Sequence, residues 1–174
     1  MYGLSSEELQ QQYPSIYQIL LDRVKPERDT NNRAAYREKW WLFGENNLSM
    51  RSSLSGLNRF MLSVRTARHR LFSFADSSVL PESKLITVGS NDGLTLGILS
   101  SRLHVCWSNA AGGWLGVGND ATYNHTDCFN KFPFPDACPE QQAQIRDLAE
   151  RLDTHRKRQQ AQHPELSLTG MYNV

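Results

Sequence analysis

The sequence lacks the features that mark several large classes of protein. It has three cysteines in 174 residues, an odd number that gives no disulfide framework and indicates a reduced, intracellular protein. Its apolar runs fall well short of the roughly 18 to 20 residues that a membrane span requires, so we expect no membrane contact. The first 20 residues are polar and acidic, which argues against a signal peptide and favours a cytoplasmic location.

An excess of charge of one sign is also missing. The chain carries 19 lysines and arginines against 18 aspartates and glutamates, a formal net charge of +1. The whole-molecule charge therefore does not indicate a nucleic-acid partner, and any such signal must be local.

Motifs for catalysis or metal binding are missing as well. The sequence has no Walker loop, no HExxH and no G-x-S-x-G, and no spacing ties its serines to its histidines. His125, Cys128 and Cys138 could donate to zinc, but a CxxC pair and a fourth ligand are absent, so we predict no metal site and no catalytic residue. The chain is predicted to bind rather than to catalyse.

The N-terminal part is predicted to be helical. Residues 5–8 have the S-x-x-E pattern of a capping box, and Pro14 suits the first turn of a second helix, which Pro26 ends. The segment 33–41 is helical or extended. The second helix has an apolar stripe formed by Ile16, Ile19, Leu20 and Val24.

The middle of the chain alternates between strand and helix patterns. Two strands, 60–64 and 71–74, flank a basic turn at 65–70, and a third covers 85–88. Leucines and a tryptophan at helical spacing predict a helix over about 94–109, closed by Gly112 and Gly113. Residues 114–124 form a loop or an irregular hairpin. Residues 129–134 are a last extended piece, which Pro133 and Pro135 place at a sheet edge or outside the sheet.

A long terminal helix is predicted to begin near Pro139 and to end at Pro164. Its single apolar stripe is too narrow to hold a free helix, so the first three turns must pack on the domain or on a partner. Its basic end, residues 156–158, is left to solvent or to something acidic. The stripe comprises Ala143, Ile145, Leu148, Ala149 and Leu152.

A basic segment is the clearest functional signal. Residues 46–75 contain five arginines and no acidic residue, a composition that suits contacts with phosphate. The alternative is a solvated basic surface whose acidic partners lie elsewhere in the sequence. We predict DNA-phosphate contacts for Arg51, Arg59, Arg65, Arg68, His69 and Arg70.

A glycine-rich segment, residues 112–120, raises a different possibility. Such a loop can hold an adenosyl cofactor when it lies between a strand and a helix, as in a small methyltransferase. Here a predicted helix precedes it and no helical pattern follows, so we favour an irregular loop. KFPFPD superficially resembles the NPPY-type motif of amino-methyltransferases, but Lys131 and Phe132 stand where the amide or acid should be.

Several ordered blocks resemble one family: YPSIYQILLDRVKPERD, YREKWWLFGE, TARHRLFSF, LGILSSRLHVCWSNAAGG, LGVGND and CFNKFPFP. Together they look like the target recognition domain of MmeI-like (type IIL) bacterial restriction–modification enzymes and of related S-adenosylmethionine-dependent DNA adenine methyltransferases. The tail FPFPDACPEQQAQIRDLAERLD is similar to the junction that precedes the spacer helix of type I specificity subunits.

The resemblance implies an α/β (α+β) fold, a mixed sheet with packed helices followed by a long helix. Residues 1–45 would be the helical start of the recognition domain, 46–136 its core, 137–163 the spacer helix and 164–174 a tail. The chain would recognise a specific double-stranded DNA sequence and would not methylate alone. The cofactor S-adenosylmethionine would belong to the methyltransferase domain of the full enzyme, in the same chain or a separate one.

The resemblance also places base recognition just after the Gly112–Gly113 pair. Gly116 and Gly118 correspond to base-reading positions by alignment alone, and the neighbouring polar side chains are our chemical choice for base edges: Asn119, Asp120, Thr122, Tyr123 and Asn124. Trp114 stands where relatives have arginine. The alternative function is a protein-interaction module that uses its C-terminal helix and does not bind DNA.

Overall fold

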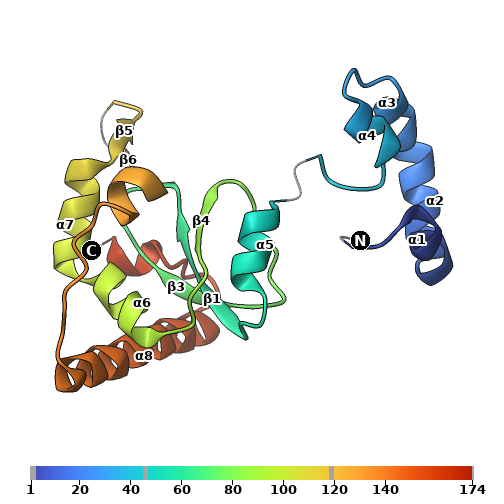
Figure 1. The fold of residues 1–174 in the computed structure, drawn as a ribbon. Helices are drawn as coiled ribbons and strands as arrows, with labels where there is room; N and C mark the ends of the chain where they lie inside the picture. The colour runs from blue at the N-terminus through green and yellow to red at the C-terminus, as the bar shows by residue number, and fades with distance from the viewer. Residues whose placement is uncertain (1–2, 45–46, 118–119, 174) are drawn as a thin grey trace. The chain divides into compact units, whose positions relative to one another are not determined.

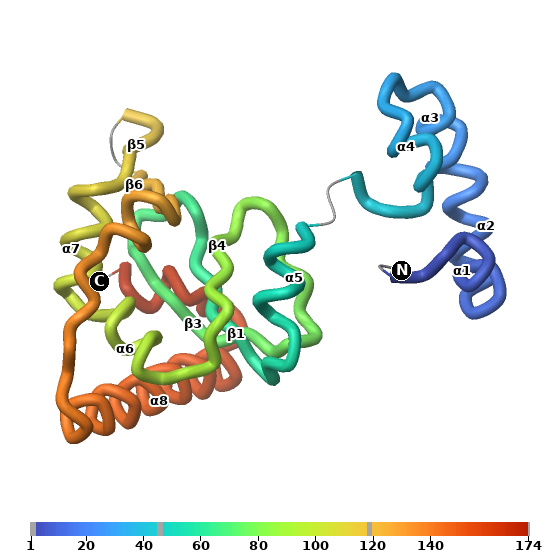
Figure 2. Tube along the Cα trace, viewed as in Figure 1, coloured from blue at the N-terminus to red at the C-terminus, as the bar shows by residue number. Residues whose placement is uncertain are grey.

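The computed structural model describes residues 3–44, 47–117 and 120–173. The chain divides into two compact units, Met1–Ser49 and Met50–Val174, which are described separately (Figures 1 and 2).

The first unit consists of short helices: α1 (Ser6–Gln12), α2 (Pro14–Arg23), α3 (Lys25–Asp29) and α4 (Ala34–Glu38). The predicted capping box is confirmed, because Ser5 Oγ accepts from Glu8 N at 3.1 Å and Ser5 N donates to Glu8 Oε2 at 2.7 Å. Pro26 does not end the second helix, which stops at Arg23, but lies in the first turn of α3. The segment 33–41 is helical over α4.

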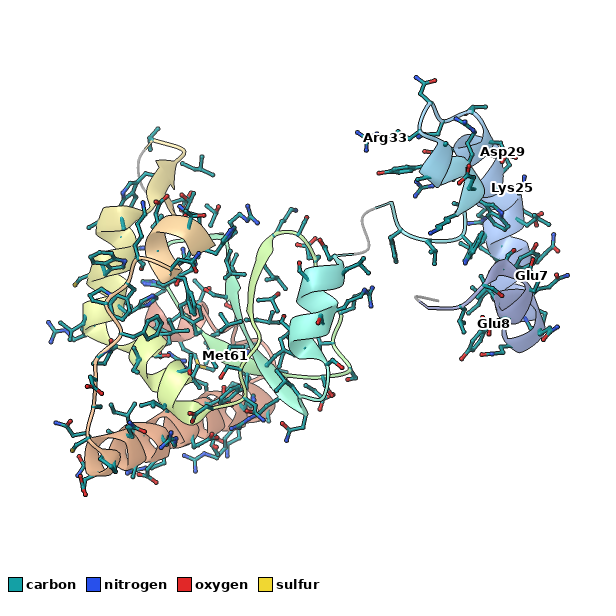
Figure 3. The ribbon with its side chains drawn as sticks, viewed as in Figure 1. Glu7, Glu8, Lys25, Asp29, Arg33 and Met61 are labelled. Carbon is teal, nitrogen blue, oxygen red and sulfur yellow. The ribbon has the colours of Figure 1, made fainter. Side chains whose placement is uncertain are left out.

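Packing in the first unit rests on few side chains. Leu9 and Trp40 are buried, Tyr17 meets Trp40 edge to face, and Trp41 Nε1 donates to Leu4 O at 3.0 Å. The predicted apolar stripe of α2 is only partly covered, since Ile16 and Ile19 are exposed. On α3, Lys25 and Asp29 form an ion pair of 2.6 Å one helical turn apart (Figure 3).

The second unit contains two small antiparallel sheets. The first has the order β3-β1-β4, with β1 (Arg59–Val64) between β3 (Ser73–Asp76) and β4 (Leu85–Val88). The second has the order β2-β6-β5, from β2 (Thr66–Ala67), β6 (Asp120–Thr122) and β5 (Gly113–Leu115). The α/β class with a long C-terminal helix is confirmed, and the strands pair as two antiparallel sheets in place of one mixed sheet.

The α-helices that follow α4 are α5 (Leu48–Leu54), α6 (Gly93–Ser100), α7 (Arg102–Ala111) and α8 (Pro139–Gln162). The helix expected over 94–109 is two helices, because Ser101 has an extended backbone and its Oγ caps α7 by accepting from His104 N at 3.2 Å. The piece expected at 129–134 leaves the sheet, as one of the two alternatives had it, but it does not begin as an extended segment. Its first residue closes a π-helical turn, η1 (His125–Phe129), and the rest of it joins neither sheet.

The core of the second unit lies between the first sheet, α6 and α8, with Met61 of β1 inside it (Figure 3). Helix α8 approaches α6 closely at Gly97, where an added Cβ would lie 2.5 Å from Ile145 Cγ2. The cluster comprises Met61, Phe72, Phe74, Ile86, Leu96, Leu99, Tyr123, Cys128 and Ala149.

The later turns of α8 are held to the domain by hydrogen bonds of buried polar side chains. The predicted apolar stripe contributes less there. Asp153 accepts from Phe74 N at 3.1 Å and from Ser73 Oγ at 3.0 Å. Arg156, expected at a solvent-facing basic end, is buried and donates to Phe72 O at 3.0 Å. Leu148 of the stripe is 60% exposed. A short turn, η2 (Gly170–Tyr172), follows, and Tyr172 Oη accepts from Arg156 Nε at 2.9 Å.

Candidate nucleic-acid interface

The second sheet joins the two segments that the sequence singles out. The basic turn supplies β2, and the glycine-rich segment supplies the β5–β6 hairpin, although they lie about fifty residues apart in the chain. Thr66 pairs with Thr122 and Ala67 with Ala121, and Tyr123 N donates to Arg65 O at 2.7 Å. The hairpin extends beyond α7, at the far side of the second unit from α8 (Figure 1).

The alternation of side chains gives this sheet one outward face. Ala121 is buried, so Asp120 and Thr122 point to the opposite, more open side. The register sets Leu115 opposite Asp120 and Thr66 opposite Thr122. We call Thr66, Leu115, Asp120 and Thr122 the hairpin face. If the pairing of β2 with β6 is extended by one residue, Arg68 lies opposite Asp120. This is the end of β2 that is nearer the hairpin turn.

Arg65 and Arg68 are the predicted phosphate residues that flank β2, and the extended pairing places Arg68 on the side of the hairpin face. Both are exposed, and neither side chain forms an ion pair with any residue that the structure describes. His69 is half-buried, and its Nε2 lies 2.9 Å from Asn173 Oδ1. Arg51 lies on α5, outside the second sheet.

Arg70 is a correction to the sequence-based prediction, because it is only 5% exposed. Its guanidinium donates to Val64 O, to Ser63 Oγ at 3.1 Å and to Ala121 O at 3.0 Å. It lies 5.0 Å from the centre of the Tyr123 ring, and burial lowers its pKa. Arg70 therefore connects the end of β1 to β6 from inside and is not available to phosphate.

Arg59 is also committed to internal contacts. It donates to Glu150 Oε2 at 2.9 Å and to Asn91 O at 3.0 Å, and it stacks 3.7 Å from the centre of the Phe74 ring. The hydrogen bond to Glu150 raises its pKa. Arg59 connects β1 to α8, so its contribution is to the fold.

Some of the predicted base-reading residues are accessible to a ligand, and others are buried or lie outside the described residues. Asp120 and Thr122 are half-exposed on the hairpin face. Gly116 is exposed with φ +66°, a left-handed conformation that favours glycine at this turn. Gly118 and Asn119 lie outside the described residues.

The structure buries Tyr123 and leaves Asn124 half-exposed, so Tyr123 is corrected and the role of Asn124 stays a prediction. Tyr123 is 1% exposed, and its hydroxyl lies 3.1 Å from Nε2 of the buried His104. His104 Nδ1 lies 2.9 Å from Leu99 O, a carbonyl that can only accept, so Nε2 is left to accept from the tyrosine. Asn124 Oδ1 accepts from Asp127 N at 2.7 Å and caps the π-helical turn. Tyr123 supports the end of β6 from within, and Asn124 holds the start of η1.

Among the described residues of the hairpin, three apolar side chains that were not predicted as site residues are widely exposed. Trp114 is 51%, Leu115 55% and Val117 97% exposed. The sequence contained a signal for this exposure, because three apolar residues stand together in a short glycine-rich segment. The paired strand β6 supplies a single buried alanine, Ala121.

Within residues 3–44, 47–117 and 120–173 no cluster of three or more histidine, cysteine or acidic side chains could hold a metal ion. The same part of the chain has no helix that is long and apolar enough to cross a membrane.

Comparison with known proteins identifies the fold and then the family. A solved structure of the Type IIL restriction–modification enzyme MmeI in complex with DNA matches with a TM-score of 0.68 at 20% identity. The match covers 99% of this chain and 22% of that one, so this chain spans about a fifth of the enzyme's length. A family model described as "MmeI, target recognition domain" matches residues 5–136. The chain belongs to the MmeI target recognition domain family. No curated protein matches it.

Proposed function

We propose that this chain recognises a specific sequence of double-stranded DNA for a restriction–modification enzyme. The observation that carries the proposal is the second sheet, which places exposed Arg65 and Arg68 beside a projecting hairpin. Membership of the MmeI target recognition domain family supports it, as does the likeness of the fold to an enzyme that was solved with DNA.

The proposed contacts follow from the shape and charge of the sheet. The major groove of B-DNA admits a two-stranded β-ribbon, the shape of the β5–β6 hairpin. Arg65 and Arg68 would contact phosphates and set the register of the protein on the duplex. Asp120 would accept from an amino group on a base edge, and the Thr122 hydroxyl could either donate or accept.

The remainder of the proposed enzyme lies outside this chain. We propose that the full enzyme is a cytoplasmic DNA adenine-N6 methyltransferase, in which a methyltransferase domain in the same or a separate chain binds S-adenosylmethionine. That domain would flip the target adenine out of the duplex and methylate it. This chain would choose the sequence, and α8 would serve as the spacer toward the methyltransferase domain.

A second candidate function is a protein-interaction module without DNA binding. The exposure of Leu148 on α8 favours it, because the helix keeps an apolar side chain that its own unit does not cover. The two candidates differ in whether the isolated chain binds a duplex.

The test compares Arg68→Ala with Arg151→Ala, which removes an exposed arginine from α8 and leaves the second sheet intact. Binding to labelled duplexes is measured by fluorescence anisotropy from about 50 to about 200 mM salt. We expect Arg68→Ala to weaken all duplexes alike and to reduce the slope of log K against log salt by about 0.9, the value for one phosphate. Arg151→Ala should leave the slope unchanged. Equal slopes for the two variants, or no binding by the wild type, would overturn the proposal.

A further inference from the structure

The apolar end of the hairpin suggests what the sheet would read. Leu115 belongs to the hairpin face, and Val117 follows it at the turn with almost its whole side chain exposed. Neither can donate or accept a hydrogen bond, so each would leave a polar base edge desolvated without a partner. These two positions are poorly suited to most of what the major groove presents.

The major groove displays one apolar group, the 5-methyl group of thymine. Building on the function proposed above, we propose that Leu115 and Val117 contact thymine methyl groups, so the recognised sequence contains thymine beneath the hairpin. Because the extended pairing sets exposed Arg68 opposite Asp120, the cross-strand neighbour of Leu115, a polyanionic duplex suits this end better than an apolar protein surface.

The sheet register separates Leu115 from the neighbouring tryptophan. Trp114 lies opposite the buried Ala121, so it points to the other side of the hairpin and is left out of the proposed contact. Leu115 lies opposite Asp120, and side chains in this relation are about 5 Å apart at Cβ. A carboxylate acceptor about 5 Å from an aliphatic group fits an A·T pair, whose major-groove edge presents the adenine amino group and the thymine methyl group on either side of thymine O4.

The experiment uses the full chain and a duplex that it selects from a randomised library. Each thymine of that duplex is replaced in turn by deoxyuridine, which removes only the 5-methyl group. We expect one or two positions at which the uracil duplex binds about threefold to fivefold more weakly, the loss for one methyl contact removed from water. At those positions Leu115→Ala or Val117→Ala should bind thymine and uracil duplexes equally.

Matched controls lie elsewhere in the second unit. Leu148→Ala on α8 and Val79→Ala in the loop after β3 each shorten an exposed aliphatic side chain, and both should keep the full preference for thymine. Circular dichroism confirms that each variant is folded.

The possible outcomes separate this inference from the function on which it rests. A selected duplex that binds equally well with uracil at every position overturns the methyl contact and leaves sequence recognition standing. The same holds if the hairpin variants weaken thymine and uracil duplexes alike, which would indicate insertion between base pairs. Failure to bind any duplex overturns both proposals.

Discussion

Replacing Arg70 with methionine should destabilise the second unit by about 3 kcal/mol. The change keeps an unbranched apolar stem but removes every donor that the guanidinium uses. The Ala121 carbonyl is buried and loses its bond from Arg70, which costs about 1 to 3 kcal/mol. The Val64 carbonyl, in a half-exposed residue, recovers part of its loss by binding water. Loss of the desolvated cation over the Tyr123 ring adds about 1 to 2 kcal/mol.

The free energy of unfolding is measured by denaturant titration with circular dichroism, with Arg68→Met as the control. Arg68 lies two residues away and is exposed, so its replacement should change the unfolding free energy by less than about 0.5 kcal/mol. If Arg70→Met were as mild as Arg68→Met, Arg70 would not hold β6 to the end of β1.

Two further predictions concern stability. Asp153→Ala should lower the free energy of unfolding by about 2 to 3 kcal/mol, because it leaves the Phe74 N–H without its acceptor. Denaturant titration against Asp147→Ala, an exposed site on the same helix, checks this, and equal losses would contradict it. Stability should also decline as the pH falls below about 6.5, since burial lowers the pKa of the His104 imidazole and the unfolded chain then binds the proton more tightly. Unfolding midpoints are measured at pH 7.5 and 5.5. The drop in midpoint at the lower pH should be smaller in His104→Gln than in the wild type and unchanged in His155→Gln. An equal drop in the two variants would refute the prediction.

Local chemistry made some elements predictable from sequence. The Ser5 capping box, the strand at Leu85–Val88 and the start of α8 at Pro139 each depend on residues within one or two turns. The break between α6 and α7 was missed because Ser101 stands inside an apolar period that would also suit one continuous helix.

Burial of the polar residues could not be predicted in the same way. Arg65, Arg68 and Arg70 look alike in a list of basic residues, but only the pairing of β2 with β6 brings the Ala121 carbonyl to Arg70. Tyr123 was chosen as a base reader for its polar hydroxyl, and the histidine that accepts from that hydroxyl lies on α7, about twenty residues earlier in the chain. Such contacts depend on strand register and helix packing, which a single sequence does not specify.

The most direct test of the proposed function is selection from a randomised duplex library with the whole chain at about 50 mM salt, where phosphate contacts are least screened. The proposal predicts enrichment of a short, asymmetric motif, and Arg68→Ala should weaken the retention of all duplexes without changing that motif. Retention without enrichment would show phosphate binding alone and would contradict base recognition by the isolated chain. If no duplex were retained, the central claim of DNA recognition would be wrong for this chain.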